Sequence, residues 1–135
     1  MTSTVKLVDA DGPFIEFRRS DARLVSSALS YVLSSVSTPA TVELLLGSPA
    51  ERVDRYRAKL TDAIEAAQRA YEARESREAS KVRVPAQRAH LLYTALVVST
   101  HMTRSEEEYN IQVGAFKENA LDLADGIIAA FESPG

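Results

Sequence analysis

Two histidines, His90 and His101, are the side chains best suited to acid–base or metal chemistry near neutral pH. They are 11 residues apart in a segment predicted to be helical, so about 16 Å separates them along the helix axis and they cannot share a metal ion or a proton. His101 precedes Glu106, Glu107 and Glu108, but glutamates at a helix start interact favourably with the helix dipole and need no metal. We therefore predict no metal site and no catalytic histidine.

The other motifs also lack a catalytic or cofactor-binding pattern. Residues 9–12 (Asp-Ala-Asp-Gly) look like the opening of a calcium loop, but Pro13 occupies the third acidic position and Ser20 stands where the loop needs glutamate. No serine lies in G-x-S-x-G or S-x-x-K, no glycine-rich phosphate loop is present, and the absence of cysteine excludes disulfides and thiolate metal sites. The sequence favours a protein that is not an enzyme and holds no cofactor.

The charge pattern argues against a nucleic-acid surface. The formal net charge is −3, and the 10 basic residues of segment 49–88 are interleaved with 7 acidic ones, which indicates a solvated helix face. From Arg104 onward there are 2 basic and 7 acidic residues. We expect no nucleic-acid partner, and this acidic end slightly favours a basic protein partner.

Nothing in the sequence predicts a membrane protein. The N-terminus lacks the pattern of a signal peptide. The uncharged stretch Leu24–Val42 carries eight hydroxyl residues and Pro39, so it is expected to be a core helix and its exit. The predominance of arginine over lysine, 12 to 4, is typical of GC-rich bacterial genomes, and we predict a bacterial, cytoplasmic protein.

The residue pattern of the N-terminal half predicts a hairpin followed by helices. Segments 4–8 and 13–18 alternate in polarity on either side of an Asp-Gly turn. Ser20 is expected to cap a helix from Asp21, with apolar positions at Ala22, Val25, Leu29, Val32 and Val36, which Pro39 must end. A short apolar helix, residues 40–46, should follow and close at Gly47.

The second half predicts two more long helices. Ser48 and Glu51 form a capping box, with Pro49 at the first helical position, for a helix that runs to Glu78. Residues 81–84 are a short strand or linker, and residues 87–102 an apolar helix. A second capping box at residues 103–106 starts a last helix, residues 105–131, and residues 133–135 are a disordered tail of a single domain, residues 1–132.

A repeat in the pattern organises these elements. Shifting the chain by 67 residues lays segment 15–33 over segment 82–100, with four identities. Either two buried helices share a pattern because burial requires it, or a strand-helix-helix unit is duplicated. Both interpretations predict an α+β, mostly helical fold. Four main helices, two central and apolar and two long and flanking, accompany an N-terminal β-hairpin and a third short strand at 81–84.

The absence of catalytic patterns favours a non-catalytic protein-interaction module, such as a bacterial immunity or antitoxin-like protein or another small helical adaptor. Its working surfaces would be the long helices 49–78 and 105–131, and their surplus apolar residues also predict a homodimer. The predicted contact residues are Tyr56, Leu60, Tyr71, Tyr109, Phe116, Leu121 and Ile128.

The alternative is a small-molecule-binding regulator or an enzyme with a polar pocket between the central helices. Tyr31, His90 and Tyr93 would line that pocket together with the serine and threonine hydroxyls. The competing interpretation of these hydroxyls is that they hydrogen-bond to carbonyl groups of their own helices.

Overall fold

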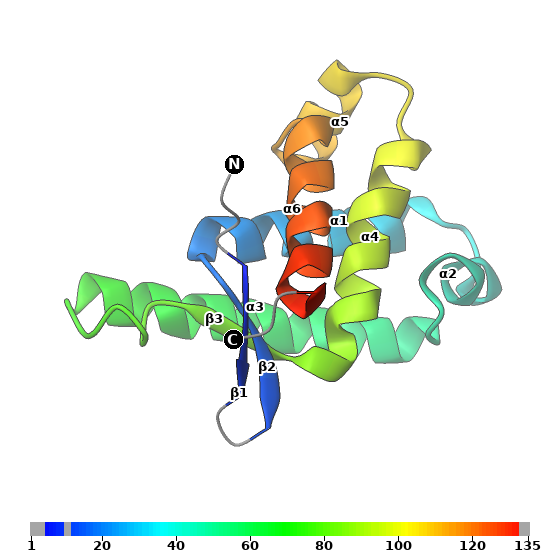
Figure 1. Cartoon of the computed structure of the whole chain (residues 1–135). Helices are drawn as coiled ribbons and strands as arrows, with labels where there is room; N and C mark the ends of the chain where they lie inside the picture. The colour runs from blue at the N-terminus through cyan, green and yellow to red at the C-terminus, as the bar shows by residue number, and fades with distance from the viewer. Residues whose placement is uncertain (1–4, 10–11, 133–135) are drawn as a thin grey trace.

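The structure, a computed structural model, describes residues 5–9 and 12–132 of the chain (Figure 1). It is α+β and mostly helical, as the sequence predicts. In chain order its elements are β1 (Lys6–Asp9), β2 (Pro13–Phe17), α1 (Arg19–Ser35), α2 (Pro39–Leu46), α3 (Ala50–Glu72), β3 (Val82–Pro85), the 3₁₀ helix η1 (Ala86–Arg88), α4 (Ala89–Met102), α5 (Glu106–Val113) and α6 (Lys117–Glu132). The predicted tail and the centre of the predicted hairpin turn, Ala10 and Asp11, lie outside the described residues.

Helices α1 and α4 form the centre of the fold. They pack against each other, α3 packs against α1, and α6 packs against α4. In Figure 1, α4 and α6 stand side by side while α3 runs across their direction. Val25 and Leu29 of α1 and Leu92 and Leu96 of α4 are buried, and each such side chain stabilises the fold by about 1.5–3 kcal/mol. The prediction of two central apolar helices is confirmed.

The sheet places β2 between β1 and β3, and both pairings are antiparallel. Ile15 and Phe17 of β2 are buried together with Val82 and Val84 of β3, because alternate residues of a strand face the same side. The predicted hairpin and the predicted third strand are therefore confirmed.

Two predicted helix starts are wrong by one or two residues. Helix α1 begins at Arg19 without a side-chain cap, so Ser20 lies inside the first turn and Asp21 pairs there with Arg18 at 3.1 Å. Helix α3 begins at Ala50, with Pro49 rather than Ser48 at the N-cap position. The extended backbone that precedes each helix sets its start, and no serine cap is needed.

Helix α3 ends at Glu72, six residues before the predicted Glu78. The Arg74 amide donates to the Tyr71 carbonyl at 3.1 Å and the Glu75 amide to the Ala70 carbonyl at 2.9 Å, which is the Schellman arrangement. Arg74 takes the left-handed conformation, φ 58°, that glycine usually supplies. The sequence predicts a longer helix because no glycine or proline marks this end.

The predicted last helix is two helices. Gly114 ends α5 in the left-handed conformation, φ 85°, and α6 starts three residues later. The capping box also lies two residues further on: the Ser105 hydroxyl accepts from the Glu108 amide at 3.1 Å, and the Glu108 carboxylate accepts from the Arg104 amide at 3.2 Å. Each half of the chain therefore contains a short helix before its long one.

The elements repeat at a constant distance along the chain. Helix η1 begins 67 residues after α1, α5 begins 67 after α2, and α6 begins 67 after α3. The two glycines that end the short helices, Gly47 and Gly114, obey the same offset. Burial of two helices alone does not require that these helix starts and both glycines share one offset. Apart from β1, the fold therefore consists of two units of one strand and three α-helices, and the second unit also contains η1. They are here called the first repeat (residues 13–72) and the second repeat (residues 82–132).

Candidate functional site

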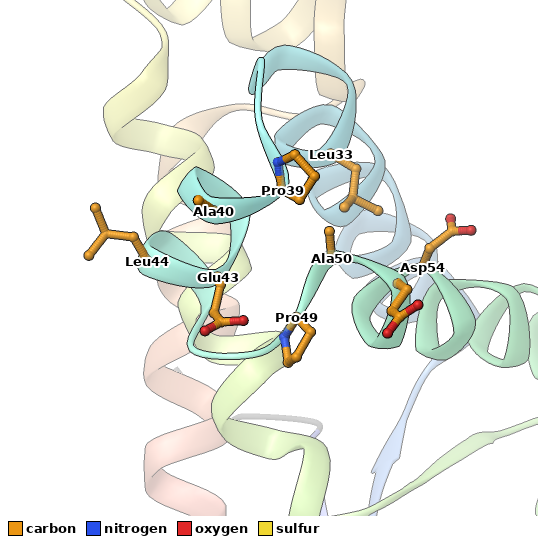
Figure 2. Close-up of a pocket in the computed structure, with 9 residues that line it drawn as sticks. Leu33, Pro39, Ala40, Glu43, Leu44, Pro49, Ala50 and Asp54 are labelled. Atoms are coloured by element: carbon orange, nitrogen blue, oxygen red, sulfur yellow. The ribbon is translucent and has the colours of Figure 1, made fainter.

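An open groove lies where α2 connects the end of α1 to the start of α3 (Figure 2). Its volume is about 1070 Å³. It is lined by the apolar residues Leu33, Pro39, Ala40, Leu44, Pro49 and Ala50 and by the acidic residues Glu43, Glu51 and Asp54. This set of residues is called the α2–α3 groove below.

Helix ends on both sides of α2 shape this groove. The Thr38 hydroxyl caps α2 by accepting from the Thr41 amide at 3.2 Å, and Pro39 occupies the first turn. At the other end Gly47 has φ 74°, in the left-handed region. Pro49 then precedes α3. The chain therefore turns twice within a few residues and holds α2 across the ends of two longer helices.

Helix α2 buries one side and exposes the other. Val42 and Leu46 belong to the core, whereas Leu44 is 81% exposed. In Figure 2 the Leu44 side chain points away from the helix toward solvent, while Leu33, Pro39 and Ala50 gather between α1, α2 and α3. The groove thus combines an apolar floor with a projecting leucine.

The acidic residues make the groove negative. Asp54 pairs with Arg57 at 2.8 Å, but Glu43 and Glu51 form no ion pair with any residue that the structure describes. Among the described residues that line the groove there is no basic side chain and no histidine, serine or threonine. This arrangement suits binding of a ligand that is apolar on one side and positively charged on the other, and the ionisable side chains that line the groove are carboxylates.

The second repeat carries a matching exposed residue. Ile111 of α5 corresponds to Leu44 of α2 and is 72% exposed. Phe116, which corresponds to Pro49, is also exposed, as are Leu121 and Ile128 of α6. These four residues include three of the predicted contact residues, and their side chains are on the surface as that prediction requires.

Two other predicted contact residues are not on the surface. Tyr109 is fully buried, and Leu60 is among the core residues of α3. The expectation of a surface position is wrong for both. Leu60 faces the core from α3. Tyr109 turns inward because α5 is a separate helix, and its hydroxyl lies 2.8 Å from the Ser99 hydroxyl. The sequence offered no sign of this inward turn beyond Gly114.

The remaining predicted contact residues lie beneath arginines. The Arg88 guanidinium stacks over Tyr56 at 4.2 Å, and the Arg19 guanidinium over Tyr71 at 3.6 Å. Such cation–π contacts hold the rings in place and cover one face of each. These tyrosines therefore organise the local surface of α3.

The three residues predicted for a polar pocket have different surroundings. Tyr31 and Tyr93 pack partly buried against the core, and His90 is exposed with its Nε2 atom 3.5 Å from the Thr94 hydroxyl. None of the three lines the α2–α3 groove. The hydroxyls of Ser34, Ser99 and Thr100 donate to carbonyls three residues earlier, at 2.7–3.1 Å, which is the behaviour that the competing interpretation expects of them.

Within residues 5–9 and 12–132, no group of three or more histidine, aspartate or glutamate side chains is placed to hold a metal ion. His101 is exposed near the end of α4. No helix of this part of the chain combines the length and apolar character needed to cross a bilayer. Comparison with protein-family models, curated proteins and solved structures found no match to this chain.

Proposed function

We propose that the protein is a non-catalytic protein-interaction module whose α2–α3 groove binds a basic amphipathic segment of a partner protein. The observation that carries this proposal is the open apolar groove with two unpaired carboxylates, Glu43 and Glu51, beside the exposed Leu44. A bacterial immunity or antitoxin-like protein, in which the bound segment belongs to a toxin, is one form of such a module.

The groove offers both an apolar surface and negative charge for such binding. Burying the exposed Leu44 and the apolar floor against apolar side chains of the partner would stabilise the complex by roughly 25 cal/mol per Å² of apolar surface removed from water. The entropy lost on association offsets part of this stabilisation. Carboxylates at the rim would attract lysine or arginine side chains, which accelerates association and fixes the orientation of the bound segment. The ligand expected from this apolar surface and these carboxylates is a helix with leucines on one face and lysines on the other.

Fluorescence anisotropy with two labelled peptides tests this proposal. One is an amphipathic helix of leucine and lysine, and the other has the same leucines with glutamate in place of lysine. We expect the basic peptide to bind at least tenfold more tightly than the acidic one. Leu44→Asp should weaken binding of the basic peptide at least tenfold, and Glu51→Gln about threefold to fivefold.

The second repeat provides matched controls. Ile111→Asp changes another highly exposed apolar residue at the corresponding position of α5, and Glu118→Gln changes the carboxylate 67 residues after Glu51. Both should leave peptide binding within twofold of the original chain. If the basic peptide does not bind, or if the control variants weaken binding as much as Leu44→Asp and Glu51→Gln do, the proposal is wrong.

A different surface favours homodimerisation as a second candidate function. Leu121 and Ile128 are exposed and seven residues apart on α6. In an antiparallel pair of α6 helices, Leu121 of each copy would therefore face Ile128 of the other. Asp125 lies between them on the same face and would lie near Asp125 of the second copy. Because salt screens the repulsion between these two carboxylates, it should strengthen the dimer. Light scattering should show more dimer in 1 M than in 50 mM salt, and Leu121→Asp with Ile128→Asp should abolish it. A chain that remains monomeric at both salt concentrations would exclude this candidate.

A further inference from the structure

A second pocket, separate from the α2–α3 groove, is lined by five basic residues and two serines. It has a volume of about 290 Å³ and is formed by the start of α1 and the segment that leads into β3. Its lining residues are Arg18, Arg19, Ser20, Arg23, Arg77, Ser80 and Lys81. Leu33 of the groove lies about 21 Å further along α1 than Arg19. This set of residues is called the basic pocket below.

Most of the positive charge in the basic pocket is not neutralised. Arg18 forms an ion pair with Asp21 at 3.1 Å. Arg19, Arg23, Arg77 and Lys81 form no ion pair with any residue in the described part of the chain. Four cationic side chains therefore converge on one small pocket without a carboxylate among its lining residues.

A neutral residue holds two of these cations in place. The Gln68 side-chain oxygen accepts hydrogen bonds from both Arg19 and Arg23, each at 2.7 Å. The Gln68 amide nitrogen donates to the Glu72 carboxylate at 3.0 Å, which fixes the amide with its oxygen toward the arginines. Stacking over Tyr71 further restrains Arg19. The two guanidiniums are thus ordered before any ligand arrives, which lowers the entropic cost of binding.

The end of α3 brings the other two cations to this site. Because the Schellman turn at Arg74 ends the helix early, residues 75–81 return toward α1. Within this segment the Ser80 amide donates to the Arg77 carbonyl at 3.2 Å and the Lys81 amide to the Glu78 carbonyl at 3.1 Å. Arg77 and Lys81 are therefore at the two ends of one turn. The sequence alone does not predict the pocket, because its cations come from segments more than 50 residues apart.

We propose that the basic pocket binds a small ligand that carries two or more phosphate groups. Several cations with little neutralisation match the multiple negative charges of an oligophosphate, and planar guanidiniums donate paired hydrogen bonds to phosphate oxygens. The Ser20 hydroxyl forms no hydrogen bond to a described residue and offers one more donor. The pocket volume suits a short phosphate chain or the phosphates of a nucleotide, and these two sources share the same chemistry.

Isothermal titration calorimetry with inorganic tripolyphosphate and with ATP, both in the absence of metal ions, tests this proposal on the full chain. We expect binding of tripolyphosphate in a one-to-one ratio. Arg77→Gln and Lys81→Gln should each weaken it about fivefold to tenfold, and the double variant about 50-fold. Arg55→Gln is the matched control, since Arg55 is an exposed residue of α3 outside the pocket, and it should change the affinity less than twofold.

Comparison of the two ligands identifies the source of the phosphates. Equal affinities indicate that the pocket recognises the phosphate chain alone, whereas tighter binding of ATP indicates a nucleotide, and both results support the proposal. Absence of tripolyphosphate binding, equal losses in Arg77→Gln and Arg55→Gln, or binding of a single-stranded oligonucleotide without binding of tripolyphosphate would each overturn it. Thermal denaturation of each variant checks that the fold is retained, and these outcomes do not depend on the α2–α3 groove.

Discussion

Glu16 and Arg83 are separated by 67 residues in the chain, yet they face each other directly across β2 and β3, with Arg83 Nε 3.1 Å from Glu16 Oε2. Their separation equals the offset between the two repeats, so each residue is the counterpart of the other. An antiparallel pair of equivalent residues lies on a local two-fold axis. The ion pair therefore marks the axis that relates the repeats within the sheet, and α1 and α4 pack against each other on either side of it.

Exchanging the two charges should restore the stability that either single change removes. Glu16→Arg places two arginines opposite each other and Arg83→Glu places two glutamates there, and each should lower the free energy of unfolding by about 0.5–1 kcal/mol. The double variant rebuilds the pair in the opposite sense at positions with equivalent backbone surroundings. Urea denaturation should show that the double variant regains at least half of the free energy of unfolding that the less stable single variant loses. Strictly additive losses in the double variant would show that the two side chains do not stabilise the protein as a pair.

Gly47 and Gly114 should respond equally to substitution. Both end a short helix in the left-handed conformation, with φ 74° and 85°. An added Cβ would meet only the His90 Nε2 atom at 3.9 Å in the first case and no atom within 4 Å in the second, so the cost is that of the backbone conformation. Gly47→Ala and Gly114→Ala should each lower the free energy of unfolding by about 1 kcal/mol. Thermal unfolding checks this expectation, and a loss above 3 kcal/mol at either site would point to an unrecognised steric conflict.

The central part of the fold follows from the sequence because it depends on local pattern. Segments 22–36 and 87–102 contain almost no charge, and such helices must be buried whatever surrounds them. The alternation of residues 13–18 and 81–84 likewise predicts strands, and antiparallel pairing of these strands buries Ile15 and Val84 together. These elements need no information from distant parts of the chain.

The candidate sites do not follow from the sequence because chain reversals create them. Arg74 adopts a left-handed conformation without glycine, which no propensity predicts, and this turn completes the basic pocket. The α2–α3 groove depends on how α2 crosses two longer helices, although Pro39, Gly47 and Pro49 mark the reversals. The sequence predicts Tyr109 on one long helix with an exposed face, whereas the break at Gly114 makes α5 a separate helix that buries Tyr109 in the core.

Replacing Arg74 with glycine should stabilise the protein. Arg74 is exposed, and its backbone is strained at φ 58° at the end of α3, whereas glycine adopts that conformation without strain. Arg74→Gly should raise the free energy of unfolding by about 0.5–1 kcal/mol, after allowing for the greater freedom of glycine in the unfolded chain. Ala66→Gly, at an exposed position inside α3, should lower it by about 1 kcal/mol. A loss in Arg74→Gly comparable with that in Ala66→Gly would show that Arg74 contributes contacts that outweigh its strain.

Tyr109 should make stability depend on pH above 10. Burial, opposed in part by the hydrogen bond with Ser99, raises the pKa of Tyr109 above its ordinary value of 10.0. Above pH 10 the unfolded chain therefore releases this proton while the folded chain retains it. Because the folded state then binds more protons, its stability falls as pH rises from 10 toward the pKa of Tyr109 in the folded chain, by at most about 1.4 kcal/mol per pH unit.

Tyr109→Phe separates this contribution from those of other groups that titrate in the same range. At pH 7 the variant should be about 1 kcal/mol less stable, because it loses the bond to Ser99 while Ser99 still donates to the Leu96 carbonyl at 2.9 Å. Urea denaturation at several pH values should show that the difference in free energy of unfolding between the original chain and the variant narrows above pH 10, since only the original chain carries the buried phenol. A gap that stays constant from pH 7 to pH 11 would mean that Tyr109 ionises as readily in the folded chain as in the unfolded one.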